Sequence, residues 1–211
     1  MLFMDLETSA IDNAADFVRD VDAPSNYKSA EAVAKYKAEA KASAIEKAAL
    51  DPWLLRIVAF GYAVDDEPAR AIIAKNEGEE MALLVLLWDA VRMQINAGDT
   101  VIGWNLLNFD LTAAITRSRL LGVKPAFSSL KKYNQFGVTD LMLEYSFNGL
   151  IPNKSMAFVC QRFGIPDTDT ISGKDIPALV ASQQWDLVEA HVLADINKTR
   201  QLANRIGLVK F

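Results

Sequence analysis

The sequence predicts an α/β protein in which helices pack on a mixed β-sheet. The main observation is that segments typical of strands and of helices alternate along the 211 residues. Hydrophobic residues make up 51% of the chain, which excludes a disordered or fibrous protein. A chain of this length suits one sizeable domain and no second independent core. We therefore treat residues 1–211 as a single domain.

Hydrophobic periodicity and the positions of Gly and Pro predict the individual elements. The expected strands are 2–6, 54–64, 69–74 and 100–104. The expected long helices are 29–50, 79–98, 108–122 and 185–206. The stretch 123–175 predicts two or three short helices with irregular connections, including 139–147 and 154–164.

The sequence predicts a helical insertion after the first strand, at about residues 12–52. Residues 12–28 are polar and irregular, whereas 29–50 lack Gly and Pro and are rich in Ala, Lys and Glu. Ser29 is a suitable N-cap, and Pro52 lies just past the end. The next two strands flank an acidic turn and predict a hairpin, so this helix interrupts a three-strand meander.

The composition argues against several classes of protein. The longest apolar run, 81–88, is too short to span a bilayer, and no secretory signal is expected. The single cysteine, Cys160, excludes an internal disulfide and a cysteine-rich zinc site, so we expect a reducing cytoplasm. The net charge of −5 argues mildly against a nucleic-acid binder, although two bound divalent cations would bring it to −1.

Asp5 and Glu7 place two charges in the first apolar strand. Alternate residues of a strand point to opposite faces, so these carboxylates share one face about 6–7 Å apart. Leu2, Met4 and Leu6 occupy the other face. The alternative explanation is an edge strand with a solvated polar face.

Asp110 lies in the first turn of the helix 108–122, directly after the buried strand 100–104. A purely local role is one explanation. Asn108 would be the N-cap of this helix, and Asp110 would interact favourably with the helix dipole.

Asp195 and His191 lie one turn apart in the final helix. Asp195 falls in the middle of an apolar stripe formed by Val188, Val192, Ile196, Thr199, Leu202 and Ile206. A buried carboxylate needs a cation, a hydrogen-bond network or a raised pKa, and a structural salt bridge is an open alternative. His191, the only histidine, is a candidate catalytic residue, with packing as the alternative.

Taken together, Asp5, Glu7, Asp110 and Asp195 form a pattern that is more specific than any one of them. Clustered carboxylate oxygens suit Mg²⁺ or Mn²⁺ rather than zinc. Two such ions about 4 Å apart can activate a water molecule and stabilise the leaving oxygen of a phosphodiester. We therefore expect two divalent cations as cofactors.

The segments FMDLETSA, GWNLLNFD and HVLAD resemble the three motifs of the DEDD 3′–5′ exonucleases, which have the ribonuclease H-like fold. The resemblance covers nearly the whole chain apart from 12–52. It points to the proofreading domains of family-B DNA polymerases and to their free-standing, often phage-encoded, relatives. The pattern Asn-x-x-Asn-Phe-Asp in the second motif is typical of that branch.

The resemblance implies a metal-dependent exonuclease that removes nucleoside monophosphates from single-stranded DNA 3′ ends in replication or repair. It implies that Asp5, Glu7, Asp110 and Asp195 bind the metals and that a polymerase or other replication protein is a partner. An RNA exonuclease of the same superfamily is an alternative. A catalytically weak nucleic-acid-binding module with this fold is another.

The third motif departs from the pattern of the family. The tyrosine subclass has Tyr-x-x-x-Asp and the histidine subclass has His-x-x-x-x-Asp. Here three residues separate His191 from Asp195, so the residue of one subclass stands at the spacing of the other. The residue at this position orients or deprotonates the attacking water. Histidine can do so near neutral pH because its reference pKa is about 6.5.

Five further residues are candidate substrate contacts. The resemblance implies that Thr8 contacts the terminal nucleotide, that Ile11 is an apolar wedge near the terminal base, and that Asn105 and Phe109 support the second motif. Local roles are the alternatives, namely a turn hydrogen bond for Asn105 and core packing for Phe109. Lys174, in the segment SGKDIP, is either a phosphate contact or a surface residue of a loop.

The lysines of the expected insertion allow two interpretations. They could form a basic wall that grips the phosphates of the strand, or a solvated helix in which lysines pair with neighbouring acids. These lysines are Lys28, Lys35, Lys37, Lys41 and Lys47.

Overall fold

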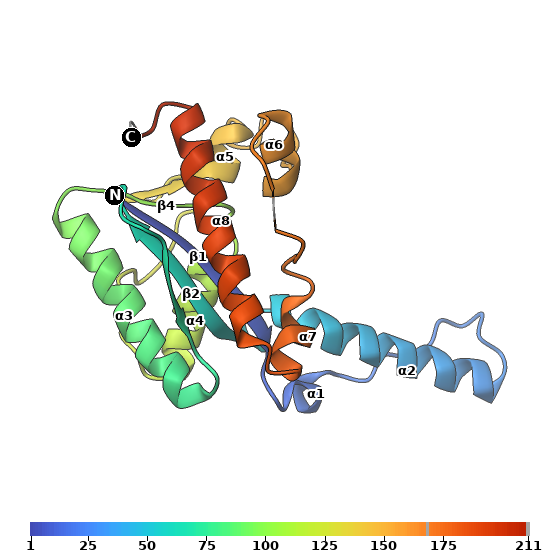
Figure 1. Cartoon of the computed structure of the whole chain (residues 1–211). Helices are drawn as coiled ribbons and strands as arrows, with labels where there is room; N and C mark the ends of the chain where they lie inside the picture. The colour runs from blue at the N-terminus through green and yellow to red at the C-terminus, as the bar shows by residue number, and fades with distance from the viewer. Residues whose placement is uncertain (168, 210–211) are drawn as a thin grey trace.

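The computed structural model describes residues 1–167 and 169–209, without the side chain of Glu46. The strands are β1 (Leu2–Ala10), β2 (Leu55–Val64), β3 (Arg70–Ile73), β4 (Val101–Gly103) and β5 (Val138–Asp140) (Figure 1). The helices are α1 (Ala14–Phe17), α2 (Ala30–Lys47), the 3₁₀-helix η1 (Ala48–Leu50), α3 (Glu77–Asn96), α4 (Asp110–Leu120), α5 (Leu141–Tyr145), α6 (Met156–Arg162), α7 (Ile176–Ala181) and α8 (Trp185–Arg205).

The five strands form one mixed sheet in the order β3-β2-β1-β4-β5. β2 is antiparallel to both β1 and β3, whereas β4 is parallel to both β1 and β5. This architecture confirms the predicted α/β class. Because β1 lies at the centre of the sheet and its residues 2–4 are fully buried, the alternative of a solvated edge strand is wrong.

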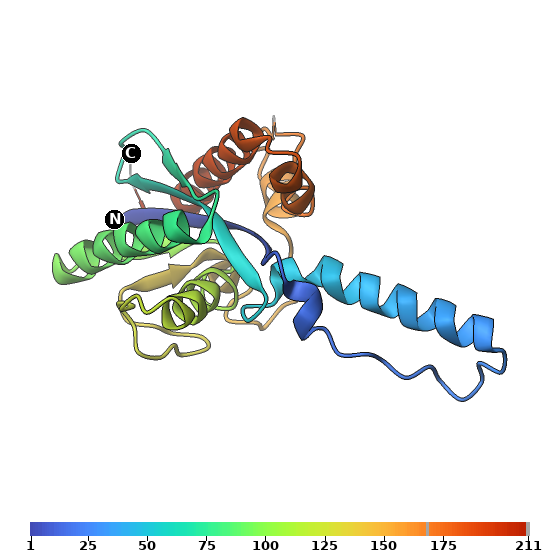
Figure 2. The same ribbon diagram turned by 90° about the horizontal axis from the view of Figure 1, so that it is seen from below.

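Helices cover both faces of the sheet, and β1 has a different role on each (Figure 2). Leu2, Met4 and Leu6 pack with residues of α3 and α4 in one apolar cluster. Phe3 points to the other face, where it packs with α8 residues such as Ile196. Asp5 and Glu7 alternate with the first set, as predicted, so they share the α8 face with Phe3.

Glycine allows α8 to lie close to the sheet beside the acids. Gly61 pairs with Asp5 in the register of β1 and β2. A Cβ at Gly61 would lie 2.6 Å from Val192 Cγ2 and 3.2 Å from the Val192 carbonyl oxygen. A larger residue there would therefore push α8 away from β1.

Several elements differ from their predicted bounds. β1 continues to Ala10, past a bulge between Glu7 and Thr8, because its pairing with β2 continues. The three-residue strand β5 and the short helices α1 and α7 were not predicted, since segments of this length give little periodic signal. In α8 the predicted apolar stripe is buried up to Leu202, whereas Ile206 lies beyond the helix and is exposed.

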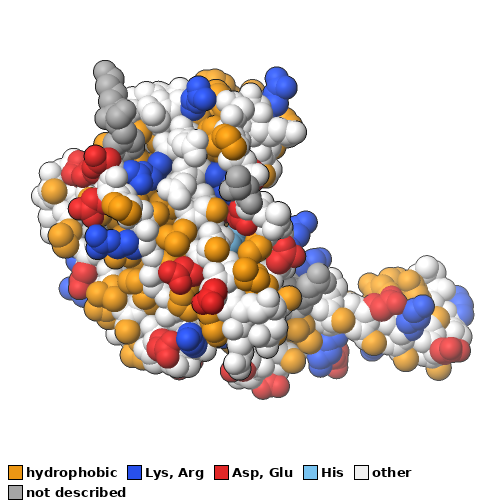
Figure 3. Space-filling view, in the orientation of Figure 1, with side chains coloured by type: hydrophobic (Ala, Val, Ile, Leu, Met, Phe, Trp, Pro, Cys, Tyr) orange, Lys and Arg blue, Asp and Glu red, His pale blue; other side chains and the backbone are white. Residues whose placement is uncertain are grey.

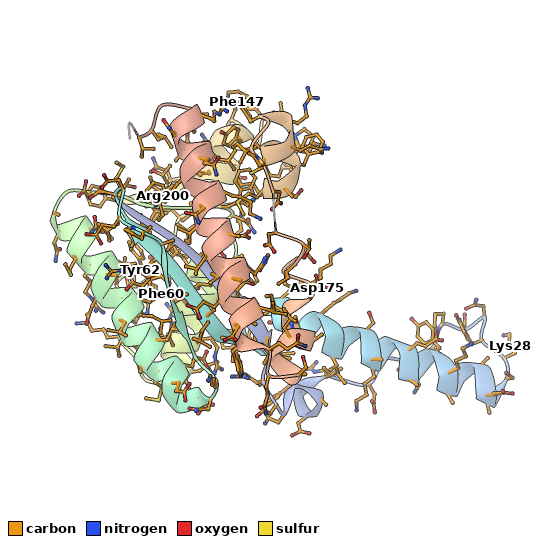
Figure 4. The ribbon with its side chains drawn as sticks, viewed as in Figure 1. Lys28, Phe60, Tyr62, Phe147, Asp175 and Arg200 are labelled. Atoms are coloured by element: carbon orange, nitrogen blue, oxygen red, sulfur yellow. The ribbon has the colours of Figure 1, made fainter. Side chains whose placement is uncertain are left out.

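Residues 18–47, here called the arm, extend away from the sheet, and Lys28 lies at the far end (Figure 4). Ser29 caps α2 as predicted, because its Oγ accepts a hydrogen bond from the Ala32 N–H at 3.1 Å. Acidic and basic side chains are mixed along the arm (Figure 3). The ion pairs are Lys37–Asp22 (3.3 Å), Lys41–Asp20 (4.0 Å) and Lys35–Glu39 (3.9 Å).

These pairs favour the solvated helix over the basic wall. The interpretation of 12–52 as an insertion stays a prediction. No helix in the described part of the chain is both long and apolar enough to cross a bilayer.

Candidate metal centre

The predicted acids lie together between β1, the start of α4 and the middle of α8. The Leu6 N–H donates a hydrogen bond to Asp110 Oδ1 at 3.0 Å, which ties the first residue of α4 to β1. Glu7 and Asp110 are buried, whereas Asp5 and Asp195 keep partial contact with solvent. Burial raises the pKa of Asp5 most, and the charges of Asp110, Glu7 and Asp195 raise it further, as expected for four neighbouring carboxylates.

Glu7, His191 and Asp195 form the tightest part of this cluster. Each offers one ligand atom, and these atoms lie within 4.8 Å of one another, so the three residues could hold a metal ion. His191 Nε2 is 3.4 Å from Glu7 Oε1 and 4.0 Å from Asp195 Oδ2. The i,i+4 relation between His191 and Asp195 therefore places both side chains toward β1.

Burial and mutual repulsion disfavour the charged form of these carboxylates. Both raise the pKa of Asp5 and of Glu7 well above the ordinary range, burial most strongly. Burial raises the pKa of Asp110 to about 8, although the hydrogen bond from the Leu6 N–H opposes the shift. The carboxylates thus need additional positive charge to be stable when ionised. Their clustered oxygen donors fit divalent cations such as Mg²⁺ or Mn²⁺.

Lys198 supplies part of that charge and was not predicted from the sequence. Its Nζ lies 2.7 Å from Asp195 Oδ1 and 3.3 Å from Asp167 Oδ1. Burial alone would lower the pKa of Lys198, but the hydrogen bonds and charges of Asp195 and Asp167 raise it above the ordinary value. The salt-bridge alternative for Asp195 is therefore present alongside its place in the cluster.

Asp169 is a second unpredicted member of the site. Its Oδ2 lies 2.5 Å from His191 Nδ1, and both side chains are buried. The hydrogen bond fixes the histidine ring from the side opposite Glu7. His191 is thus part of a polar network and not a packing residue.

Asp140 holds the connection between β4 and α4 in place through hydrogen bonds. Asp140 accepts hydrogen bonds from the Leu107 N–H at 2.9 Å and the Met142 N–H at 3.0 Å. Asn105 adopts a left-handed conformation with φ 58°, which Asn tolerates better than most residues, and its carbonyl accepts from the Phe109 N–H. The turn role predicted as an alternative for Asn105 is therefore present.

The predicted cap of α4 is wrong. Asn108 is exposed and precedes the true cap position, Phe109, which gives α4 no side-chain hydrogen bond in the described structure. Phe109 packs against the core instead, as its alternative role predicted. The helix therefore begins at Asp110, one residue later than an N-cap at Asn108 would place it.

The remaining candidate substrate contacts are hydrogen-bonded to other parts of the chain or are exposed. The Thr8 hydroxyl donates to the Ala49 carbonyl of η1 at 2.7 Å. Ile11 is half-buried at the end of β1, and its N–H donates to the Leu54 carbonyl. Lys174 is exposed in the loop before α7. Contact of these residues with a nucleic acid stays a prediction.

Sequence reasoning could have found one of the missed residues. Lys198 follows Asp195 by three positions and borders the apolar stripe at Thr199, so a charged pair inside the stripe was visible. Asp167 and Asp169 lie in an irregular connection, where no periodicity indicates which way a side chain points.

Comparisons with known proteins support the fold. No protein-family model and no curated protein sequence matches this chain. A solved structure that matches is the family B DNA polymerase from the hyperthermophilic archaeon Pyrobaculum calidifontis, with a TM-score of 0.63 and 17% sequence identity. The match covers 97% of this chain and 24% of the polymerase, so the chain spans about a quarter of its length. The protein has a ribonuclease H-like α/β fold, as predicted.

Proposed function

We propose that this protein is a metal-dependent 3′–5′ exonuclease that removes nucleoside monophosphates from the 3′ ends of single-stranded DNA. The main support is the meeting of Asp5, Glu7, Asp110 and Asp195, from three separate elements, in one cluster with His191. The fold shared with a DNA polymerase supports a nucleic-acid substrate and a setting in replication or repair, with a polymerase or other replication protein as partner.

The four acids would hold two divalent cations, Mg²⁺ or Mn²⁺. Bound cations of this kind supply Lewis acidity toward a phosphodiester and offset negative charge. Within the described residues, the ammonium group of Lys198 is in contact with Asp195, and one positive charge cannot balance four ionised carboxylates and a phosphate.

His191 is the proposed proton acceptor. Its Nε2 faces Glu7 and Asp195, at 3.4 Å and 4.0 Å. When water attacks phosphorus, His191 Nε2 takes the proton of the water as the new P–O bond forms. The bond from phosphorus to the 3′ oxygen breaks, and that oxygen takes a proton from solvent. The products are a 5′-nucleoside monophosphate and a strand shorter by one nucleotide.

The surroundings of the cluster favour a flexible strand end. Glu7, Asp110 and His191 are at most 6% exposed, so a substrate must reach them through the partly exposed Asp5 and Asp195. An unpaired 3′ end can thread toward such a site more easily than a duplex. We retain Thr8, Ile11, Asn105, Phe109 and Lys174 as proposed contacts, listed here for mutagenesis.

The direct test is a time course on a single-stranded oligonucleotide labelled at its 5′ end. We expect a ladder of products shortened from the 3′ end with Mg²⁺ or Mn²⁺, and no ladder with chelator or in Asp5→Ala. Asp186→Asn, an exposed acid in the first turn of α8, is the matched control and should degrade the strand normally. A ladder that persists in Asp5→Ala would contradict the proposal.

A matched RNA oligonucleotide separates the two nuclease alternatives. A 2′-hydroxyl is the feature by which a site distinguishes RNA from DNA. We expect faster degradation of the DNA strand. Faster degradation of the RNA strand would instead identify an RNA exonuclease that uses the same carboxylates.

A further inference from the structure

His191 lies between two carboxylates, one at each ring nitrogen. Nδ1 is 2.5 Å from Asp169 Oδ2, and Nε2 is 3.4 Å from Glu7 Oε1. The side chains of His191 and Asp169 are 5% and 7% exposed, so water competes little for this hydrogen bond. Asp195 and Lys198 also face this pair, at 4.0 Å from Nε2 and 3.9 Å from Asp169 Oδ2, and Asp175 lies within electrostatic range of the ring.

Asp169 is itself held in place. Its Oδ1 accepts a hydrogen bond from the Ile171 N–H at 2.9 Å, which leaves Oδ2 directed at the histidine. Its own N–H donates to Asp167 Oδ1 at 3.2 Å. Asp167 in turn contacts Lys198 of α8. The carboxylate therefore has one fixed orientation relative to α8.

This geometry determines where the ring proton lies. A carboxylate oxygen has only lone pairs to offer when ionised, so a hydrogen bond of 2.5 Å to Nδ1 requires a proton on Nδ1. A neutral imidazole has one such proton, and its second nitrogen then has a free lone pair. That lone pair is on Nε2, which faces Glu7 and Asp195.

We propose that Asp169 is a positioning residue that fixes His191 in the tautomer with its proton on Nδ1 and keeps Nε2 available to accept a proton. The proposal deepens the proposed function and rests on it for the role of Nε2. Asp169 acts through the ring of His191. The same hydrogen bond could serve only to anchor residues 169–175 to α8, and the two roles differ in what they predict for the ring.

The chain offers an unusually clean measurement, because His191 is its only histidine. Protein labelled with [¹⁵N]histidine gives one pair of ring nitrogen signals, from which the tautomer is assigned directly. We would record them for metal-free protein over a pH series and assign the tautomer where the two signals show a neutral ring. The expected result is a protonated Nδ1 and an unprotonated Nε2.

Asp169→Asn is the informative variant, because it keeps the size of the side chain. Its amide can donate a hydrogen bond to an unprotonated Nδ1, so we expect the Nε2-protonated tautomer to become populated. Asp167→Asn is the matched control for the spectrum. It removes the charge of the neighbouring carboxylate but keeps the Oδ1 that accepts the Asp169 N–H, so it should leave the tautomer as in the wild type.

Kinetics on the labelled oligonucleotide separate positioning from anchoring. We expect Asp169→Asn to lower kcat by about 10- to 100-fold, in the range known for residues that orient a functional histidine. KM should change by less than about twofold, because Asp169 acts through the His191 ring and is not a proposed contact of the nucleic acid. A role limited to anchoring would lower thermal stability and leave both the tautomer and kcat unchanged.

An Nε2-protonated ring in the wild type would overturn the proposal without any variant. An unchanged tautomer and unchanged kcat in folded Asp169→Asn would also overturn it. The spectrum does not depend on nuclease activity. A protein with the expected tautomer that degrades no nucleic acid would therefore refute the proposed function and leave the assignment of Asp169 to the ring intact.

Discussion

Two groups of buried charge lie on opposite faces of the sheet and are balanced in opposite ways. On the α3 and α4 side, Glu80 meets Arg117 through two parallel hydrogen bonds of 2.8 and 2.7 Å. Glu80 also accepts the Ile57 N–H of β2 at 2.9 Å. This pair joins two helices and a strand, and each charge has its partner within the chain.

On the α8 side, acids outnumber bases. Asp5, Glu7 and Asp110 have raised pKa values because burial and their neighbours oppose ionisation, and Lys198 contributes the nearest ammonium group at Asp195. The comparison shows that this protein neutralises one buried carboxylate, Glu80, with its own arginine. On the α8 side, in contrast, four carboxylates have too little positive charge around them, which is the arrangement expected of a site that binds cations.

Asp195→Asn should have the largest effect. It removes a proposed metal ligand and the partner that Lys198 contacts at 2.7 Å, while keeping the size of the side chain. We expect kcat/KM on the labelled strand to fall by at least about 10³-fold, because transition-state charge would lose its stabilisation. Activity within about tenfold of the wild type would remove Asp195 from the site.

Arg117→Met should affect the fold and not the chemistry. It leaves Glu80 buried without its partner, and loss of one member of a buried ion pair destabilises by about 3–5 kcal/mol. Urea unfolding would measure this loss, with Arg119→Met on the exposed side of α4 as the control, expected to lose less than about 1 kcal/mol. Equal losses in the two variants would mean that the buried pair has no special role.

Asp110→Asn should have the opposite sign in the metal-free protein. The folded-state pKa of Asp110 is raised from 3.8 to about 8, so the folded state holds a proton that the unfolded state has released. Stability therefore falls as pH rises through this window. The asparagine still accepts the Leu6 N–H and never ionises, so we expect it to be more stable by up to about 5 kcal/mol near pH 8 and nearly equal near pH 4.

Thermal unfolding in chelator at several pH values measures this difference. The pH slope should decrease without vanishing, because the pKa values of Asp5 and Glu7 are raised as well. The same variant should lose nuclease activity. Destabilisation near pH 8 would show that Asp110 is already compensated within the chain.

Neutralising the arm should have the smallest effect. Lys35, Lys37 and Lys41 are exposed and lie 3.3–4.0 Å from acids of the arm itself. Replacing all three with glutamine should change the affinity for a single strand by less than about twofold and leave its salt dependence unchanged. A clear loss of both would restore the basic wall as an interpretation.

Three acids of the site could be predicted from the sequence because they interrupt the apolar pattern of a strand or a helix. Asp5 and Glu7 share the face opposite Leu2 and Leu6 through the two-residue period of a strand, and Asp195 interrupts a helical stripe. Asp169 could not be predicted, because its position depends on where an irregular connection crosses α8. The false N-cap at Asn108 has a similar cause, since Asp140 shapes this turn by accepting the N–H of Leu107, 33 residues away.

The most direct test of the account is a crystal grown with Mn²⁺ and measured at a wavelength where manganese scatters anomalously. We predict anomalous density among Asp5, Glu7, Asp110 and Asp195, with Asp195 Oδ1 shared with or released by Lys198. A structure at saturating Mn²⁺ with no density there, and with Lys198 as the only counter-charge of these acids, would contradict the claim that the cluster binds cations.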